Sequence, residues 1–271
     1  MRLALSLVAL LAAAAPAAYA QFGAAIRTGR PMRAIGAYTL GAKVFQAQHG
    51  LRLRRTGVGD PVVRRTVSTD HVLRYGITET FEVSAVVAWR VDDLLNLGPT
   101  IDVVSPRGFT SLQLGGRFNV CVEDGPRPAI SVQTRVLLPQ GGDALTGFPR
   151  AHLGQTTILA VGKTLAPRVA GFANVGFTHT GRDAAARGFY ALAFRVRAAE
   201  NLYTFAETFG QLNSFNPDLN VGLGYLLGPD VQLDAAAGLR SLGGFEGDAP
   251  DGEEDWYLGL GVSWRVHGRG E

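Results

Sequence analysis

The chain of 271 residues has a single cysteine, Cys121, and few charged residues, which make up 18% of the sequence. One cysteine excludes an internal disulfide framework even in an oxidising compartment. So low a charged fraction is unusual for a protein that faces water on every side. The formal net charge of +3 is spread along the chain and is not gathered in a basic arm. The composition therefore gives no indication of a nucleic-acid partner.

Long hydrophobic runs are absent after the first twenty residues, so no transmembrane helix is expected in the mature chain. Residues 1–20, MRLALSLVALLAAAAPAAYA, combine the positive Arg2, an apolar run and a final Ala-Tyr-Ala. This is the form of a cleavable secretory signal. A retained membrane anchor is the alternative, but the run is barely long enough and Pro16 interrupts it. We expect an exported protein whose mature chain begins near Gln21.

What the sequence has in place of helices is alternation, most clearly in residues 256–266, WYLGLGVSWRV. Large apolar residues from Trp256 to Val266 occupy every second position, and the positions between them are small or polar and end with Arg265. A period of two residues indicates a strand. An apolar face with aromatic residues near both ends, opposite a polar face, is typical of outer-membrane barrels. Because lipid cannot satisfy the edge of a sheet, such strands must close into a barrel.

The same alternation recurs along the mature chain and predicts about twelve strands. They are expected at residues 43–54, 68–76, 80–91, 109–120, 128–138, 151–164, 168–179, 187–198, 201–211, 218–227, 230–240 and 255–266. Short turns alternate with longer loops, as periplasmic turns and extracellular loops do in these proteins. The predicted fold is an all-β, up-and-down antiparallel transmembrane β-barrel. A secreted β-sandwich is the main alternative, but its dry core could not hold the arginines of the polar face.

The charged residues on the polar face are candidate lumen-lining residues for a substrate path. They are Arg52, Arg74, Glu82, Arg90, Arg117, Arg135, Arg195, Asp234, Arg240 and Arg265. Two interpretations stay open. The charges either form a hydrogen-bonded ladder that fills the barrel, or they make a net basic lumen that attracts anionic solutes. Steric selection is expected from the long loops 92–108 and 139–150.

The pattern divides the chain into a signal peptide at 1–20, a lead at 21–42, the barrel at 43–266 and a tail at 267–271. The lead contains Arg27, Arg30, Arg33 and several glycines. It either folds into the lumen as a plug or remains a flexible periplasmic segment, and the sequence supports both equally.

Motifs for catalysis are missing: there is no G-x-S-x-G, no H-E-x-x-H and no P-loop. His152 or His179 could serve an outer-membrane lipase only beside a serine on the outer wall. The acidic residues of loop 241–254 have the irregular spacing of a solvated loop and not that of a Ca²⁺ site. We expect no enzyme activity, no metal and no cofactor.

Several segments resemble those of bacterial outer-membrane transporters known as the MetA-pathway of phenol degradation family. They are IRTGRP, AIGAYTLGAKVFQAQHGL, LRYGITETFEVSA, LQLGGRFNV, LLPQ, QLDAAAG and DWYLGLGVSWRV, and together they span nearly the whole mature chain. The resemblance implies an outer-membrane barrel in a Gram-negative cell and an association with phenolic or other small hydrophobic compounds. One departure is the tail 267–271, because barrel proteins of this kind commonly end on an aromatic residue read during assembly. Trp264 is expected to serve instead.

Taken together, the residues and the resemblance predict a channel that passes small molecules, by diffusion or by lateral release of hydrophobic compounds. Its expected partners are outer-membrane lipid, the barrel-assembly machinery and an unidentified small solute. A structural or surface-interaction barrel with a filled lumen is the alternative, and a lipid-modifying enzyme is the third hypothesis.

Overall fold

The computed structural model describes residues 25–59, 62–95, 105–141, 148, 150–181, 185–213, 217–240 and 255–268. The predicted signal peptide and the acidic loop 241–254 lie outside the described residues, as do most of loops 92–108 and 139–150. Within the described ranges the strands are β1 (Val44–Gly59), β2 (Val62–Gly76), β3 (Phe81–Leu95), β4 (Arg107–Cys121), β5 (Ala129–Leu137), β6 (Gly154–Ala166), β7 (Val169–His179), β8 (Arg187–Arg197), β9 (Leu202–Gln211), β10 (Asp218–Leu226), β11 (Val231–Arg240) and β12 (Asp255–His267). No helix in this part of the chain is long and apolar enough to cross a membrane.

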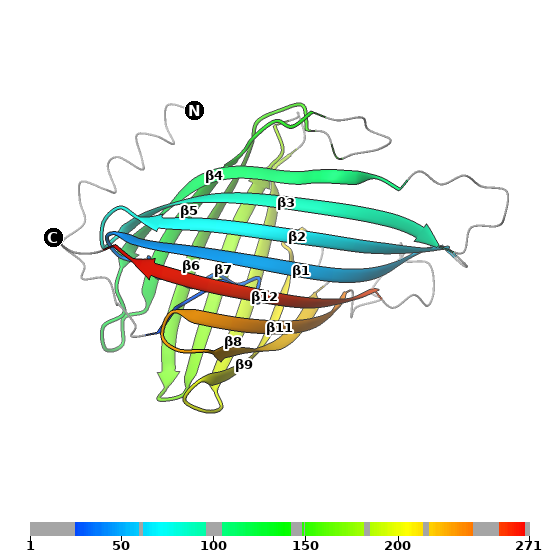
Figure 1. Ribbon diagram of the computed structural model, residues 1–271. Helices are drawn as coiled ribbons and strands as arrows, with labels where there is room; N and C mark the ends of the chain where they lie inside the picture. The colour runs from blue at the N-terminus through cyan, green and yellow to red at the C-terminus, as the bar shows by residue number, and fades with distance from the viewer. Residues whose placement is uncertain are drawn as a thin grey trace.

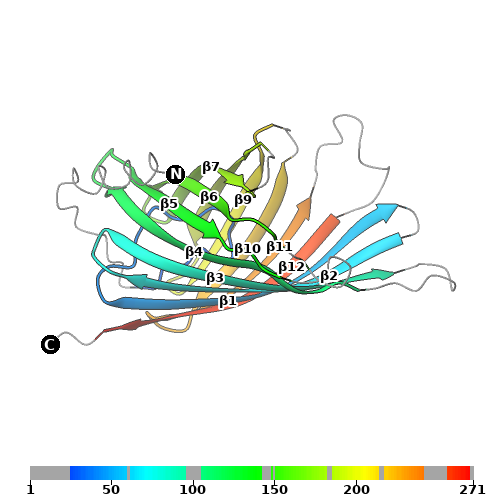
Figure 2. The same ribbon diagram turned by 90° about the horizontal axis from the view of Figure 1, so that it is seen from above.

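The twelve strands form one closed antiparallel barrel in which each strand pairs with its neighbours in sequence. The barrel is closed by β1 and β12, whose register runs from Val44 opposite His267 to Arg55 opposite Trp256. The wall can be followed from β1 to β12 in Figures 1 and 2. In Figure 1 the front strands β1 and β12 cross the rear strands β6 and β7 obliquely, as tilted barrel strands do. The predicted fold class is confirmed.

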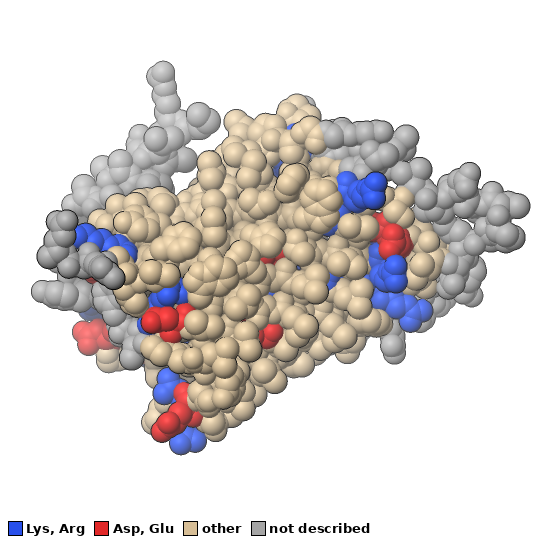
Figure 3. Space-filling model, viewed as in Figure 1, with Lys and Arg blue, Asp and Glu red and all other residues tan. Residues whose placement is uncertain are grey.

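The outer surface of the barrel is apolar. In β12 the side chains of Leu258 and Leu260 are 51% and 61% exposed, whereas Tyr257 and Ser263 between the outward positions are buried. The same two-residue alternation repeats around the wall, because successive residues of a strand point to opposite faces. In Figure 3 the charged side chains gather mainly toward the two ends of the barrel and leave a broad uncharged belt between them. Such a belt suits hydrocarbon.

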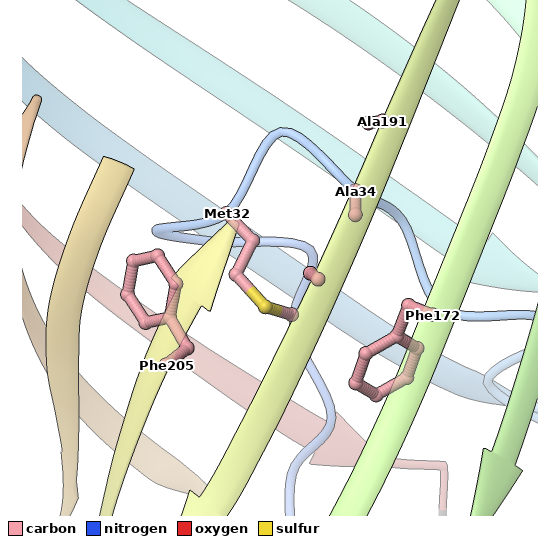
Figure 4. Close-up of a cluster of buried hydrophobic side chains, with 6 residues drawn as sticks. Met32, Ala34, Phe172, Ala191 and Phe205 are labelled. Carbon is pink, nitrogen blue, oxygen red and sulfur yellow. The ribbon is translucent and has the colours of Figure 1, made fainter. Parts of the chain in front are cut away.

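The interior of the barrel is mostly polar. Among the described residues, the largest fully buried side chains are Gln46, Gln232, Glu82, Asn119, Asn220, Ser131 and Ser263. Six of the buried apolar side chains form a small cluster, Met32, Ala34, Phe172, Ala191, Ala193 and Phe205 (Figure 4). In the core of a β-sandwich the buried side chains are mostly apolar, because the inner faces of its sheets exclude water. The interior is therefore a lumen with polar walls.

The wall formed by β1, β2 and β3 is longer than the sequence pattern predicts. Most of residues 55–67, predicted as a long loop, continue β1 and β2, with Gly57 opposite Val63 and Gly59 opposite Val62. The arginines of this stretch look like loop residues in the sequence. In the barrel one of them, Arg65, pairs with Asp93 of β3 at 2.9 Å, and Arg54, just before the stretch, pairs with Asp255 of β12 at 2.6 Å. These pairs allow a charged stretch to continue as strand.

Candidate functional site: the barrel lumen and the segment within it

Residues 25–42, here termed the inner segment, lie inside the barrel. The segment starts at the β10–β11 turn, where the Ile26 N–H donates to the Pro229 carbonyl at 2.6 Å. It returns to the end of β2, where the Lys43 N–H donates to the Gly76 carbonyl at 2.9 Å, and then continues into β1. Between these points the chain loops among the inward-facing side chains of the wall, as Figure 4 shows around Met32 and Ala34. Residues 25–42 therefore lie against the inner wall of the barrel.

Glu207 of β9 is the main anchor for the middle of the inner segment. Its carboxylate accepts hydrogen bonds from the Arg33 N–H at 2.7 and 2.8 Å and from the Ala34 N–H at 2.9 Å. Asn220 of the neighbouring β10 donates to the same carboxylate at 2.6 Å. The Glu207 side chain is buried. A buried carboxylate that binds two consecutive amides fixes both the position and the direction of the segment.

Two asparagines hold the next part of the inner segment by its backbone. Asn174 of β7 accepts from the Ile35 N–H at 2.6 Å and donates to the Ile35 carbonyl at 3.0 Å. Asn119 of β4 donates to the Ala37 carbonyl at 2.8 Å. Sequence analysis gave these uncharged residues no functional role. The sequence signal for these residues is an asparagine at an inward-facing strand position. It is weak, because a small or charged residue at such a position is equally compatible with a polar lumen.

A buried ionic cluster around Glu82 holds the return of the inner segment. The Glu82 carboxylate binds Arg74 at 2.8 and 2.7 Å, accepts from the Leu40 N–H at 2.9 Å and lies 3.7 Å from Arg117. Arg117 donates to the Gln133 side chain at 2.6 Å and to the carbonyls of Gly36 and Tyr38 at 3.1 and 3.0 Å. Three predicted lumen residues, Arg74, Glu82 and Arg117, thus form one cluster, and Glu82 and Arg117 also bind the inner segment. The Arg117 charge is therefore paired and does not face solute.

Arg30 anchors the inner segment to the wall formed by β2, β11 and β12. Its guanidinium binds Asp70 of β2 and the Leu260 carbonyl of β12, and it lies 3.6 Å from Asp234 of β11. The guanidinium lies directly against Gly50, where an added Cβ would be 1.9 Å from Nη1 of Arg30. A side chain at this position of β1 would therefore displace the arginine. Asp234, another predicted lumen residue, is buried beside this contact.

The remaining predicted lumen residues differ in their partners. Arg90 pairs with Asp92, and Arg265 donates to Asp230 at 2.6 Å at the rim formed by the β10–β11 turn. The bond from Arg265 lowers the pKa of the Asp230 carboxyl below its usual value. The side chain of Arg240 lies outside the described residues.

Three lumen arginines form no ion pair within the described part of the chain. Arg52 lies over the ring of Tyr257 at 5.2 Å, and Arg195 lies near the rings of Phe172 and Tyr203 at 5.3 and 5.2 Å. Arg135 is half-buried, and its Nε atom has no hydrogen-bond partner among these residues. The lumen thus combines the two arrangements expected from the sequence, a bonded network and a set of arginines without a carboxylate partner.

Two cavities flank the inner segment. The larger, of about 220 Å³, lies between residues 25–27 and the turns β6–β7 and β8–β9. The smaller, of about 20 Å³, lies deeper, between the segment and the side chains of Arg74, Arg117 and Phe172. Both cavities border the inner segment, whose backbone and side chains occupy the lumen between them.

No cluster of three or more histidine, cysteine, aspartate or glutamate side chains in the described ranges is placed to hold a metal ion. Two of the histidines meet on adjacent strands, with the Nδ1 atoms of His49 and His71 2.5 Å apart. The His49 ring also stacks on Trp264, with the ring centroids 4.8 Å apart. This cluster belongs to the wall of β1, β2 and β12.

Replacing Glu207 with alanine is expected to release the inner segment without unfolding the barrel. The Arg33 and Ala34 N–H groups would lose their acceptor, and each unsatisfied buried donor costs about 1–3 kcal/mol. Limited proteolysis of the folded protein should then cleave within residues 27–38, where the unaltered protein resists. Asn201→Ala, a change in the β8–β9 turn, serves as the control and should leave the segment protected. Equal resistance of Glu207→Ala would show that the carboxylate is not a main anchor.

No family model matches the chain, and no curated protein matches it in sequence. Solved structures do match. An outer membrane channel from Pseudomonas putida F1 superposes with a TM-score of 0.63 at 12% identity, over 89% of this chain and 100% of that one. The KdgM porin, solved in complex with disordered oligogalacturonate, gives a TM-score of 0.52 at 8% identity over 80% and 99% of the two chains. The chain therefore has the barrel fold found in outer-membrane channels and porins, and its resemblance to the phenol-degradation family stays a prediction.

Proposed function

We propose that this protein is an outer-membrane channel for small molecules whose lumen is narrowed by its own N-terminal segment. The observation that carries the proposal is the inner segment, which is bound to the lumen wall by buried side chains of β3, β4, β7 and β9. The apolar belt outside supports a place in lipid, and the fold shared with outer-membrane channels supports the outer membrane. The short turns then face the periplasm, and the lipid and the barrel-assembly machinery are the expected partners.

Small hydrophobic compounds are the proposed solutes. A wide aqueous path for hydrophilic solutes requires an open lumen, whereas the inner segment is bound to the inner wall by Glu82, Asn119, Asn174 and Glu207. The cluster around Phe172 and Phe205 gives the occupied lumen an apolar patch next to the segment. Compounds of this class could pass beside the segment or leave through the wall into the bilayer. The proposal involves no chemical step.

A structural or surface-interaction barrel is the second candidate, and the filled lumen favours it. The two functions differ in one consequence, because only a channel increases the flux of a solute into the cell.

Uptake by intact cells tests the proposal. A Gram-negative host producing the protein in its outer membrane should take up a radiolabelled monoaromatic hydrocarbon, at a concentration far below saturation, several-fold faster than the host alone. Liposomes containing the purified protein should swell little in a small sugar, because the inner segment obstructs hydrophilic solutes. The control is the same host producing an unrelated outer-membrane barrel at an equal level. Unchanged hydrocarbon uptake with folded protein at the surface would reject the hydrophobic channel and leave the structural barrel.

A further inference from the structure

The larger cavity beside the inner segment is strongly basic. Four arginines line it, Arg27 from the segment, Arg168 from the β6–β7 turn, and Arg195 and Arg197 from β8, against a single acid, Glu200, which is exposed on the β8–β9 turn. Around Glu82, by contrast, Arg74 and Arg117 share a buried carboxylate. An excess of positive charge around one cavity attracts anions, and the low-dielectric walls strengthen the attraction.

The two innermost of these arginines have no polar partner for their guanidinium groups. Neither Arg27 nor Arg195 makes a side-chain hydrogen bond or an ion pair within the part of the chain that the structure describes, and both are half-buried. Their guanidinium nitrogens are not among the buried side-chain atoms without a partner, so they remain accessible to an incoming acceptor.

Aromatic rings hold both guanidinium groups in place by contacts that do not use their N–H donors. Arg27 lies over the ring of Tyr38 at 4.4 Å, and Arg195 lies near Phe172 and Tyr203. In such an arrangement the ring faces the cation, and the in-plane N–H groups can still donate to an acceptor. A fork of donors held in position before binding is what a carboxylate needs for two parallel hydrogen bonds.

The rest of the cavity wall is mixed, with apolar side chains beside the polar Thr164 and Asn201. Ile26, Val169, Leu202 and Leu226 line it on the side of the short turns. The volume of about 220 Å³ is below the range of about 300–1,000 Å³ usual for drug-sized ligands, so it fits a small molecule. Arginines and apolar side chains that line one small cavity together indicate an amphipathic ligand.

We propose that this cavity is a binding site for a small organic anion, with its carboxylate on Arg27 and Arg195 and its hydrocarbon part against Ile26, Val169, Leu202 and Leu226. The site goes beyond the proposed channel function. It requires only the folded barrel and the inner segment, and it can be tested without any transport.

Calorimetric titration of the purified full mature protein in detergent tests the site, with benzoate as the probe. Benzoate is expected to bind in a one-to-one complex. Benzyl alcohol, which has the same ring without the charge, is expected to bind at least about tenfold more weakly because it lacks the charge-assisted hydrogen bonds. Inorganic phosphate, which has the charge without the ring, is expected to bind at least about tenfold more weakly because it lacks the apolar contact. Arg195→Gln should weaken benzoate binding by a similar factor.

Arg27→Gln is a second variant. It changes no residue of a barrel strand, so the barrel is expected to fold as in the unaltered protein. The matched control is Arg33→Gln. Arg33 also belongs to the inner segment and lies over a ring, Phe209 at 5.2 Å, but its side chain does not line the cavity. Benzoate affinity should fall for Arg27→Gln and stay unchanged for Arg33→Gln. Absence of benzoate binding by the folded protein, equal binding of benzyl alcohol or phosphate, or unchanged affinity in Arg27→Gln would each overturn the proposal. None of these outcomes bears on hydrocarbon uptake.

Discussion

Deletion of residues 25–40 is expected to raise the single-channel conductance of the refolded protein about tenfold. Interior side chains alone fill a barrel of about eight strands, whereas a twelve-stranded barrel is wider and is not filled by them. In this protein the inner segment supplies the missing filling. The measurement is planar-bilayer recording of the mature protein and the deletion variant under the same salt. Removal of the segment exposes Glu82 and Glu207 to water in the lumen, so neither carboxylate is left buried without a partner.

Two further observations make the conductance result specific. Glu207→Ala keeps the whole segment and loosens one anchor, so its recordings should show brief openings to the level of the deletion variant. Arg33→Gln leaves the Arg33 N–H bonds to Glu207 in place and should conduct like the unaltered protein. A folded deletion variant with unchanged conductance would contradict the assignment of residues 25–40 as the obstruction.

Glu82→Ala is expected to lower the free energy of unfolding by about 3–5 kcal/mol, the range for removing one partner of a buried ion pair. The change leaves the guanidinium groups of Arg74 and Arg117, which are 5% and 6% exposed, without their shared counter-charge. It also removes the acceptor of the Leu40 N–H. Urea unfolding in lipid vesicles, followed by tryptophan fluorescence, measures the loss.

The matched control is Asp93→Ala, which removes a carboxylate from the same strand. Asp93 pairs with Arg65, but these side chains are 32% and 52% exposed, and an exposed pair contributes about 0–1 kcal/mol. The two variants should therefore differ by several kcal/mol. A cost for Glu82→Ala as small as that for Asp93→Ala would mean that water reaches Arg74 and Arg117 in the folded barrel.

The positions of the strands could be predicted because the signal is local. The side chains Leu258 and Leu260 face outward and Tyr257 faces inward simply because successive residues of a strand point to opposite sides. The only large difference was at residues 55–67. There, the cross-strand ion pair of Arg65, together with that of Arg54 just before the stretch, compensates charges in a segment that the local pattern predicts as a loop.

The candidate site was predicted less completely. The alternation indicated that Arg117 faces inward but not that it would bind Glu82 and the carbonyls of Gly36 and Tyr38. Those carbonyls come from residues about 80 positions earlier in the chain, and no periodic pattern connects them to β4. Asn119 and Asn174 were missed for the same reason, since their function depends on backbone that arrives from elsewhere.

The sequence by itself determined the strands, the apolar outer wall and the set of polar residues that face inward, because a period of two residues assigns each side chain to a face. Only the tertiary structure decided what those inward residues bind. An inward arginine or carboxylate can be satisfied by water, by a neighbouring strand or by the inner segment, and the local pattern is identical in all three cases. The choice depends on which groups the closed barrel and the returning segment bring within hydrogen-bond distance, and this is how Glu82 and Glu207 became anchors while Arg27 and Arg195 remained beside a cavity.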